Sequence, residues 1–255
     1  MVGRFIDSVA DGREQPKIGR GCPEAVVTAP QTNRDFILGL EMTKSDAAAP
    51  GHGGSTGVAM EGEGSYNRNS AQQAAGGASA LPLLEKAAAS VAIEPDDDPV
   101  VIADFGSSQG RNSLLPLSAA IKGLRRRIGA NRPISVFHTD QPGNDFSTLF
   151  QVVHTDPGSY LRDQPSVFTF ATGKSFYEPL FPPNAITLGW SSYALMWPSQ
   201  LAALIPGHVF STRSSGAVLA AFNKRGDDDW RRFLSLRATE LKTGGRLVIC
   251  YCGAW

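Results

Sequence analysis

The stretch Val100–Gly110, VVIADFGSSQG, decides the fold of this 255-residue chain. Its first six residues form a nearly continuous apolar run, which is typical of a strand covered on both faces in a parallel sheet. The small residues that follow permit a tight turn. Beyond the turn, apolar residues recur at steps of three and four from Leu114 to Ile128, which predicts an amphipathic helix. Strand, glycine-rich turn and helix together predict one unit of a doubly wound α/β sheet.

The same rhythm continues along the rest of the chain. Two further helical stripes are expected, from Phe146 to Val153 after the starting residues Asn144 and Asp145, and from Trp230 to Leu241. Four further strands are expected at Ile134–Asp140, Val167–Gly173, Ala185–Ser192 and Arg246–Cys252. Five strands alternating with helices in this way predict a Rossmann-like, doubly wound parallel sheet.

Local residue chemistry also predicts where the helices begin and end. The helix after the turn is expected to start at Asn112 or Ser113, with Pro116 in its first turn, where a missing N–H costs little. The last helix is expected to begin at the solvated acidic run Asp227–Asp229 and to end at Gly244.

Composition bounds the class of protein. Residues 1–55 show no sustained apolar period and are broken by Gly and Pro, so we expect a disordered extension followed by one domain over residues 56–255. Lys+Arg equals Asp+Glu at 24 each, which leaves no net basic field to attract nucleic acid. No apolar stretch approaches the roughly 20 residues that cross a bilayer. The first residues lack the apolar core of a secretion signal, so we expect a cytoplasmic protein.

Cysteine and histidine usage argues against cross-links and metal. The three cysteines, Cys22, Cys250 and Cys252, are too few for a disulfide framework, and the last two are expected to be buried thiols. The four histidines lack metal-ligand spacing, so no metal site is expected. His138 falls inside a strand and is expected to be a packed or hydrogen-bonded sheet residue.

Ligands of such sheets bind beyond the carboxyl ends of the strands. The first strand ends in the pattern D-x-G-x-S-x-G, in which Gly106 and Gly110 would let a ligand approach the backbone. Asp104 in this pattern would repel a pyrophosphate but suits a cationic ligand such as S-adenosylmethionine (SAM). Asp140 ends the second strand, where a carboxylate can accept the ribose hydroxyls of a nucleoside. Both aspartates could alternatively be strand-end turn formers.

Six blocks of the chain resemble the SABATH methyltransferases, which act with SAM on salicylate, benzoate, jasmonate, caffeine precursors or, in bacteria, fatty acids. The blocks occur in the order typical of that family and cover residues 60 to 255. They are Gly62–Gln73 (GEGSYNRNSAQQ), Ile102–Leu114 (IADFGSSQGRNSL), Asp140–Phe146 (DQPGNDF), Ser175–Pro182 (SFYEPLFP), Ser191–Trp197 (SSYALMW) and Phe233–Val248 (FLSLRATELKTGGRLV).

The resemblance implies two sets of site residues. The residues implied to bind SAM are Tyr66, Ser70, Asp104, Gly106, Ser107 and Asn112 around its methionine part, Asp140 at the ribose, and Gln141, Ser175 and Phe176 around the adenine. Those implied to bind the substrate are Gln73 and Trp197, which would donate hydrogen bonds to its carboxylate, with Tyr193 and Met196 lining the pocket. Glu61 and Glu63 stand where the family often has a basic residue, and Gln141 stands where plant members have an apolar one.

This resemblance predicts a carboxyl O-methyltransferase that forms a methyl ester of a small organic or fatty acid. The acid is already ionised at neutral pH, because its pKa is near 4. No general base is therefore expected, and catalysis would come from alignment of the reacting atoms and exclusion of water. The family also leaves open N-methylation of a heterocycle. An inactive fragment of a split gene is a further alternative, whereas the absence of G-x-G-x-x-G argues against an NAD-dependent oxidoreductase.

The family continues past the fifth strand with more helical cap and two more strands, the last inserted antiparallel beside strand five. This sequence stops at Trp255, so we expect only a partial cap, with those two strands missing. The fifth strand would then present an unpaired edge that favours aggregation or pairing with another chain. A homodimer is a further expectation of the resemblance.

Overall fold

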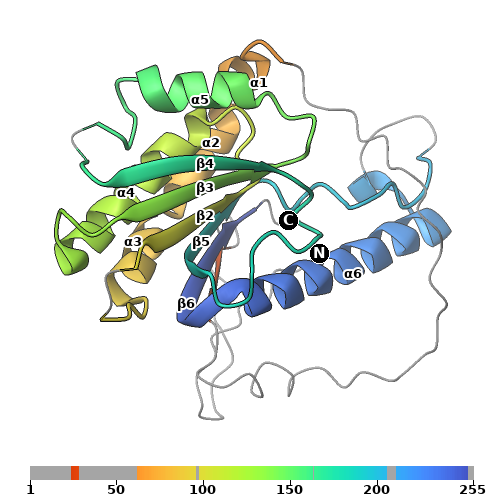
Figure 1. Ribbon diagram of the computed structural model, residues 1–255. Helices are drawn as coiled ribbons and strands as arrows, with labels where there is room; N and C mark the ends of the chain where they lie inside the picture. Colours follow the sequence, from red (N-terminus) through yellow and green to blue (C-terminus); the bar gives the residue numbers. More distant parts are fainter. Residues whose placement is uncertain (1–23, 29–61, 96–97, 163, 206–210, 252–255) are drawn as a thin grey trace.

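A six-stranded sheet with helices on both faces forms the core of the computed structural model, which describes residues 24–28, 62–95, 98–162, 164–205 and 211–251 (Figure 1). The strands lie in the order β1-β6-β5-β2-β3-β4. All neighbouring strands are parallel except β1 and β6, which pair antiparallel. The elements in chain order are β1 (Glu24–Thr28), α1 (Ser65–Asn69), α2 (Ala71–Ser79), α3 (Leu81–Ser90), β2 (Val100–Phe105), α4 (Arg111–Ile128), β3 (Ile134–Asp140), α5 (Phe146–Thr155), β4 (Val167–Gly173), β5 (Ile186–Ser192), η1 (Ser211–Arg213), α6 (Gly216–Glu240) and β6 (Leu241–Cys250).

The predicted doubly wound sheet is confirmed, and β3 and β4 have the predicted bounds. Helices α2 to α5 cover one face of the sheet, and α6 crosses the other (Figure 1). The first face contains an apolar core built around Leu117, Ile121 and Leu124 of α4. The second face packs Phe105 and Ile249 of the sheet against Phe233 of α6. Strand β2 is therefore buried on both faces, as its continuous apolar run predicts.

The start of α4 differs from the prediction. Gly110, in a left-handed conformation, precedes the helix, which begins at Arg111. Asn112 and Ser113 lie within the first turn, and their side chains reach across to other elements instead of capping the helix. Pro116 lies beyond the first turn, inside the helix and buried. The residues expected to cap the helix are thus free to build the adjoining site.

The last helix is also longer than predicted. It begins at Gly216, so Asp227–Asp229 lie in its interior. Asp229 is buried and accepts hydrogen bonds from the backbone N–H and hydroxyl of Ser199, at 2.8 and 2.6 Å. The prediction of a solvated acidic N-terminus is therefore wrong for Asp229. Gly244 lies inside β6, where a register shift accommodates it, and its close neighbour is Ala92.

Strand β1 occupies the sheet edge that was expected to be bare. Glu24–Thr28 pairs antiparallel with Arg246–Cys250 of β6. The prediction of disorder over residues 1–55 is therefore wrong for these five residues, and the others of that range lie outside the described residues. Unpaired backbone groups at a sheet edge are unfavourable, and a strand from the other end of the chain supplies their partners here.

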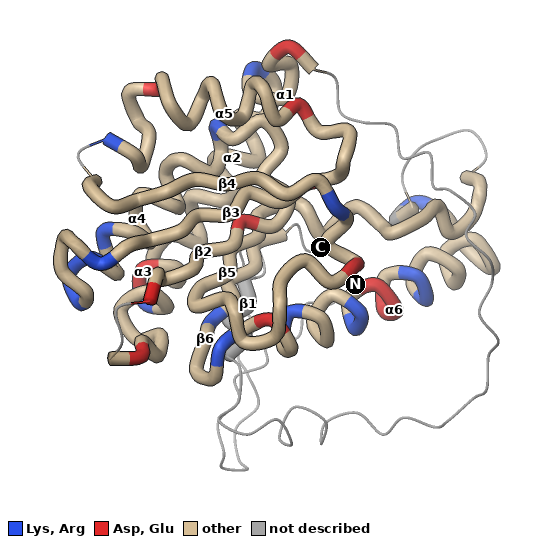
Figure 2. Tube along the Cα trace, in the orientation of Figure 1, with Lys and Arg blue, Asp and Glu red and all other residues tan. Residues whose placement is uncertain are grey.

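The distribution of charged residues and the burial of Cys250 agree with what the composition predicts. Runs of basic and acidic residues follow one another along α6 (Figure 2), and Lys224 pairs with Asp228 at 2.7 Å. Cys250 is buried, as predicted, whereas Cys22 and Cys252 lie outside the described residues. Across the described part of the chain, no helix is long and apolar enough to cross a bilayer. The same residues form no cluster of three or more potential metal ligands.

Candidate functional site

A pocket opens at the carboxyl ends of β2 and β5, the edge where ligands of parallel sheets bind. Six of the residues implied by the resemblance meet in it, from α1, α2, β2 and the turn into α4. Its lining residues are Tyr66, Gln73, Asp104, Gly106, Ser107, Asn112, Ser113, Trp190 and Ser192. The sequence did not identify Ser113, Trp190 or Ser192 as site residues. Ser192 could have been found from its place at the end of a strand.

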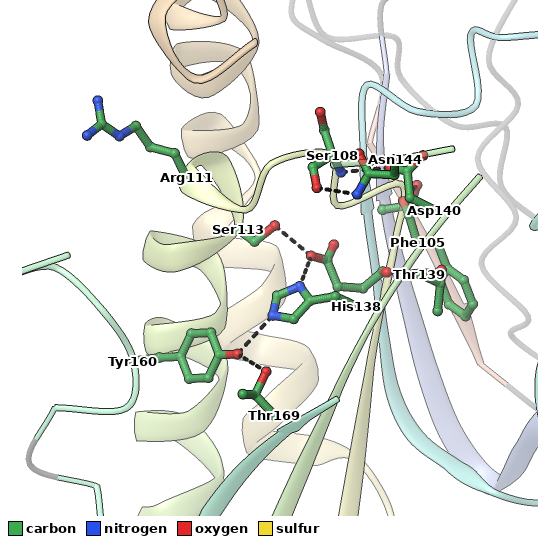
Figure 3. A network of polar contacts seen from close by, with 12 residues as sticks. Phe105, Ser108, Arg111, Ser113, His138, Thr139, Asp140, Asn144, Tyr160 and Thr169 are labelled. Atoms are coloured by element: carbon green, nitrogen blue, oxygen red, sulfur yellow. Dashed lines mark hydrogen bonds and ion pairs between the residues drawn. The ribbon is translucent and has the colours of Figure 1, made fainter. Parts of the chain in front are cut away.

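The turn between β2 and α4 is held against the end of β3. The backbone N–H groups of Gly106 and Ser107 donate to the carbonyl of Thr139, at 2.8 and 3.2 Å. Asn144 donates its amide to the carbonyl of Ser108 at 2.8 Å (Figure 3). These contacts tie the turn to the neighbouring strand and give the pocket a rigid floor.

The two glycines of this turn are required by packing within the protein. A Cβ added to Gly106, which has a φ of +84°, would overlap the Cβ of Ala194. A Cβ at Gly110 would lie 3.2 Å from the side chain of Leu149. The interpretation that these glycines make room for a ligand is therefore incomplete, because protein atoms already take the space.

Gly106→Ala should lower the free energy of unfolding by about 2–3 kcal/mol, from left-handed strain together with overpacking against Ala194. Gly216→Ala is the matched control, because Gly216 has a φ of +56° with no atom within 4 Å of an added Cβ. The control should lose only about 1–2 kcal/mol from the backbone strain. Urea unfolding measures both, and equal losses would contradict the packing explanation.

Asp104 provides a buried carboxylate with one oxygen available. Its side chain is 2% exposed, and Oδ2 accepts from Ser113 Oγ at 2.6 Å and from His138 Nδ1 at 3.0 Å. Among the described residues, none donates a hydrogen bond to Oδ1. Among the described residues, the Asp104 side chain bonds Ser113 and His138 and no backbone group of the turn. Its other oxygen is therefore available to a ligand in the pocket.

Asp140 links the end of β3 to the turn. Its two carboxylate oxygens accept from the backbone N–H groups of Ser108 and Gln141, both at 2.7 Å. Burial raises the pKa of this carboxyl above its usual value, and the two backbone hydrogen bonds oppose that shift. Asp140 is thus a turn organiser in this structure, and it is outside the lining of the pocket with Asp104.

Helices α1 and α2 form the outer wall of the pocket. Asn112 of α4 donates to Ser70 Oγ at 3.0 Å, and it lines the pocket together with Tyr66 of α1. Burial raises the pKa of Tyr66, so its hydroxyl stays protonated at neutral pH. Gly77 of α2 packs so closely on β5 that an added Cβ would lie 2.7 Å from Ser192 Oγ. The wall is therefore tied to both α4 and β5.

Comparison with known proteins now decides the family. The family model described as SAM dependent carboxyl methyltransferase matches residues 56–254. The chain belongs to this methyltransferase family. Three benzoic acid/salicylic acid carboxyl methyltransferases from Petunia hybrida are each 34% identical to it over an alignment of 205 residues. The alignment covers 75% of this chain and 57% of each relative. The chain thus spans somewhat more than half the length of these relatives.

A second relative and a solved structure extend the comparison. Salicylate carboxymethyltransferase from Clarkia breweri is 35% identical over 164 residues, which are 60% of this chain and 44% of that protein. The solved structure of a loganic acid methyltransferase with S-adenosylhomocysteine (SAH) is 25% identical, with a TM-score of 0.59. It is matched over 77% of this chain and 56% of its own. The SABATH resemblance and the Rossmann-like fold are therefore confirmed.

The pocket contains buried polar side-chain atoms that a polar ligand would bind. Gln73 Oε1 and Ser107 Oγ are buried atoms without a hydrogen-bond partner among the described residues, and both residues line the pocket beside Asp104. Buried polar atoms normally have partners, so atoms of this kind indicate a place for a polar ligand. The residues fit a ligand that carries an ammonium group and a carboxylate.

Other predicted site residues are outside the lining of this pocket. Phe176 is buried and packs edge-on against Phe233 at 5.8 Å, while Ser175 is half-buried and Gln141 exposed. Met196 and Trp197 are 50% and 64% exposed, and neither lines the pocket with Gln73. Met196 and Trp197 lie in the same segment as Tyr193, whose ring packs against Gly76 of α2. Their implied roles in adenine and substrate binding stay predictions.

Proposed function

We propose that this chain binds SAM and methylates the carboxylate of a small organic acid, giving a methyl ester. The observation that carries the proposal is the pocket in which Asp104 has one free oxygen beside two unpaired buried polar atoms, Gln73 Oε1 and Ser107 Oγ. The family match supports the reaction type. Aromatic or aliphatic acids, including fatty acids, are all within the proposed substrate class.

The chain's own residues would hold the cofactor at the strand ends. Asp104 Oδ1 would accept from its ammonium group, and Ser107, Asn112 and Tyr66 would surround the rest of its methionine part. Asp140 would accept from the ribose hydroxyls, and Ser175, Phe176 and Gln141 would surround the adenine. When bound, SAM supplies an electrophilic methyl group on a sulfonium centre. The carboxylate Asp104 favours binding of such a positively charged ligand.

Gln73 is the proposed anchor of the substrate. Its amide has donors as well as an acceptor, so it can present an N–H to a carboxylate without adding a positive charge that would weaken the nucleophile. An organic acid is ionised at neutral pH, so no residue needs to remove a proton. The protein would contribute alignment and the exclusion of water. Trp197, Tyr193 and Met196 would complete this site.

The names of the relatives point to the same substrate class. Relatives are described as acting on benzoic or salicylic acid and on indole-3-acetate, and the solved relative on loganic acid. All of these substrates are small carboxylic acids. A cytoplasmic location, a homodimer and the absence of nucleic-acid partners are further proposals from the sequence.

Gln73→Ala should lower kcat/KM for an acid substrate about 10- to 100-fold, because one hydrogen bond to a charged carboxylate is lost. Gln72→Ala is the matched control, because Gln72 is an exposed neighbour on the same helix. SAH affinity should be unchanged within a factor of about three in both variants, because the Gln73 side chain would contact the substrate and the Gln72 side chain is exposed. Equal kcat/KM values for the two variants would contradict the role of Gln73.

A methyl-transfer assay tests the proposal. The 255-residue chain is incubated with SAM carrying a radiolabelled methyl group and a panel of benzoate, salicylate, aliphatic acids and a heterocyclic amine. We expect a base-labile labelled methyl ester from at least one acid. Label on the heterocycle alone would favour N-methylation. Absence of both transfer and calorimetric SAH binding would indicate an inactive fragment.

A further inference from the structure

A chain of buried hydrogen bonds leads from the interior of the sheet to Asp104. His138 Nδ1 lies 3.0 Å from Asp104 Oδ2, and its Nε2 lies 2.8 Å from the hydroxyl of Tyr160 (Figure 3). The Tyr160 hydroxyl lies 2.9 Å from Thr169 Oγ1. His138 is 0% exposed and Tyr160 is 2% exposed. Asp104 and His138 are direct partners in the register of β2 and β3, which explains why their side chains meet.

One arrangement of the hydrogen atoms satisfies the donors and acceptors of this chain. An ionised Asp104 only accepts, so His138 Nδ1 must carry a hydrogen. A proton on Nε2 alone would place the lone pair of Nδ1 against the carboxylate. Burial raises the pKa of Tyr160, so its hydroxyl keeps its proton and can donate to Nε2. Thr169 then donates to Tyr160. Every group in the chain is satisfied when each hydrogen bond points towards Asp104.

This arrangement determines which oxygen of Asp104 faces the pocket. Ser113 and His138 both donate to Oδ2. Two donors on one buried oxygen hold the side-chain rotamer and offset part of the cost of burying the charge. A neutral imidazole does so without cancelling the negative charge, as a Lys or Arg would. Oδ1 is left with its lone pairs for a cationic ligand.

We propose that His138, in its neutral Nδ1–H form, is a positioning residue that orients the Asp104 carboxylate towards the ammonium group of the cofactor. Tyr160 and Thr169 hold the imidazole in that form. The inference rests on the proposed role of Asp104, and it adds a residue that does not itself touch the ligand. Without the histidine, Asp104 would have only Ser113 to hold it.

Three variants separate positioning from packing. His138→Phe retains an aromatic ring and removes both hydrogen bonds, whereas His138→Asn retains an amide N–H near the position of Nδ1. Thr139→Val is the control, because the Thr139 side chain is also fully buried in β3 but donates to the backbone carbonyl of Asp104, at 3.1 Å. We expect SAH binding by calorimetry to weaken about tenfold in His138→Phe, as for loss of a charge-assisted hydrogen bond. His138→Asn should recover most of this loss, and Thr139→Val should change the affinity less than about threefold.

Thermal unfolding of the same variants shows whether stability alone explains the losses. If His138→Phe and Thr139→Val weaken SAH binding equally, or if His138→Asn binds no better than His138→Phe, the positioning role is wrong. Asp104→Asn distinguishes the underlying proposal, because unchanged SAH affinity in that variant would overturn both the Asp104 site and this inference. If SAH binding is weakened in Asp104→Asn but unchanged in His138→Phe, the inference about His138 is overturned and the Asp104 site stands.

An NMR measurement on the unaltered protein tests the proposed form of the His138 ring directly and uses variants only to assign its signals. The chemical shifts of the His138 ring nitrogens report which nitrogen is protonated. They are assigned by their loss in His138→Asn or by their perturbation in Tyr160→Phe. We expect a neutral ring with the proton on Nδ1, both free and with SAH. A proton on Nε2 alone, or a doubly protonated ring at neutral pH, would overturn the proposal.

Discussion

Asp104→Asn should weaken SAH binding at least about 30-fold, because truncating one partner of a buried charged hydrogen bond costs 2 kcal/mol or more. Asp104 is 2% exposed, so water cannot replace the lost charge on its pocket oxygen. The amide would also present an N–H either to the ligand ammonium or to the donors Ser113 and His138. Both orientations put donors against each other, so the substitution should remove attraction and add repulsion.

Calorimetric titration with SAH measures this effect. Asp228→Asn is the control, because Asp228 forms an exposed pair with Lys224 on α6, away from the pocket. The control should retain the affinity of the unaltered protein, since exposed pairs contribute little. A loss below about threefold in Asp104→Asn would show that the ammonium is bound elsewhere.

Glu240→Ala should lower the free energy of unfolding by about 3–5 kcal/mol, because it leaves the buried Arg237 guanidinium without its counter-ion. Arg237 Nε lies 2.9 Å from Glu240 Oε2, and both side chains are almost fully buried. Burial lowers the pKa of Arg237, and Glu240 opposes that shift. Glu240 Oε1 also accepts from the backbone N–H groups of Leu180 and Phe181, at 2.7 and 3.2 Å.

The same pair fastens the segment that follows β4. Arg237 donates to the carbonyls of Phe176 and Glu178, at 2.8 and 3.1 Å. Replacing both charges with apolar residues, as in Arg237→Met with Glu240→Leu, should therefore recover only part of the stability, since the backbone groups stay unpaired. Segment 175–181 contains Ser175 and Phe176, which are proposed to bind the adenine.

Urea unfolding measures the stability of these variants. Lys224→Ala serves as the control, because it removes an ion pair from the exposed surface of the same helix. It should lose less than about 1 kcal/mol. A Glu240→Ala loss as small as that of the control, or full recovery in the double variant, would contradict the account of this pair.

The parts of the fold that sequence predicted well are those with local signals. Strands β3 and β4 match because each is an apolar run with clear end residues, and α5 begins after Asp145, whose side chain accepts from the N–H of Thr148 at 2.9 Å. The start of α6 could not be predicted in this way. The partner of Asp229 is Ser199, thirty residues earlier, and only the tertiary fold brings them together.

Strand β1 shows the same limit more strongly. Val26, Val27 and Thr28 favour a strand, but the run is short, and its pairing partners in β6 lie more than 200 residues away. A contact at that separation depends on the finished sheet edge, which no local pattern describes. The residues near β6 therefore predict a bare edge, which β1 in fact covers.

For the site, the turn pattern and the family resemblance identified Asp104, Gly106 and Gln73, which the structure brings into one pocket. They did not identify the contacts that hold Asp104. The partnership of Asp104 with His138 follows from the register of β2 and β3, which the sequence alone does not give. The sequence interpretation of His138 as a hydrogen-bonded sheet residue is nevertheless confirmed.

A crystal structure of the chain with SAH tests the central claim most directly. The account predicts that the ammonium group of SAH lies within hydrogen-bond distance of Asp104 Oδ1 and that the ribose hydroxyls lie at Asp140. It further predicts that His138 and Ser113 still donate to Asp104 Oδ2. SAH bound away from β2 and β3, or an Asp104 carboxylate turned from the ligand, would contradict it.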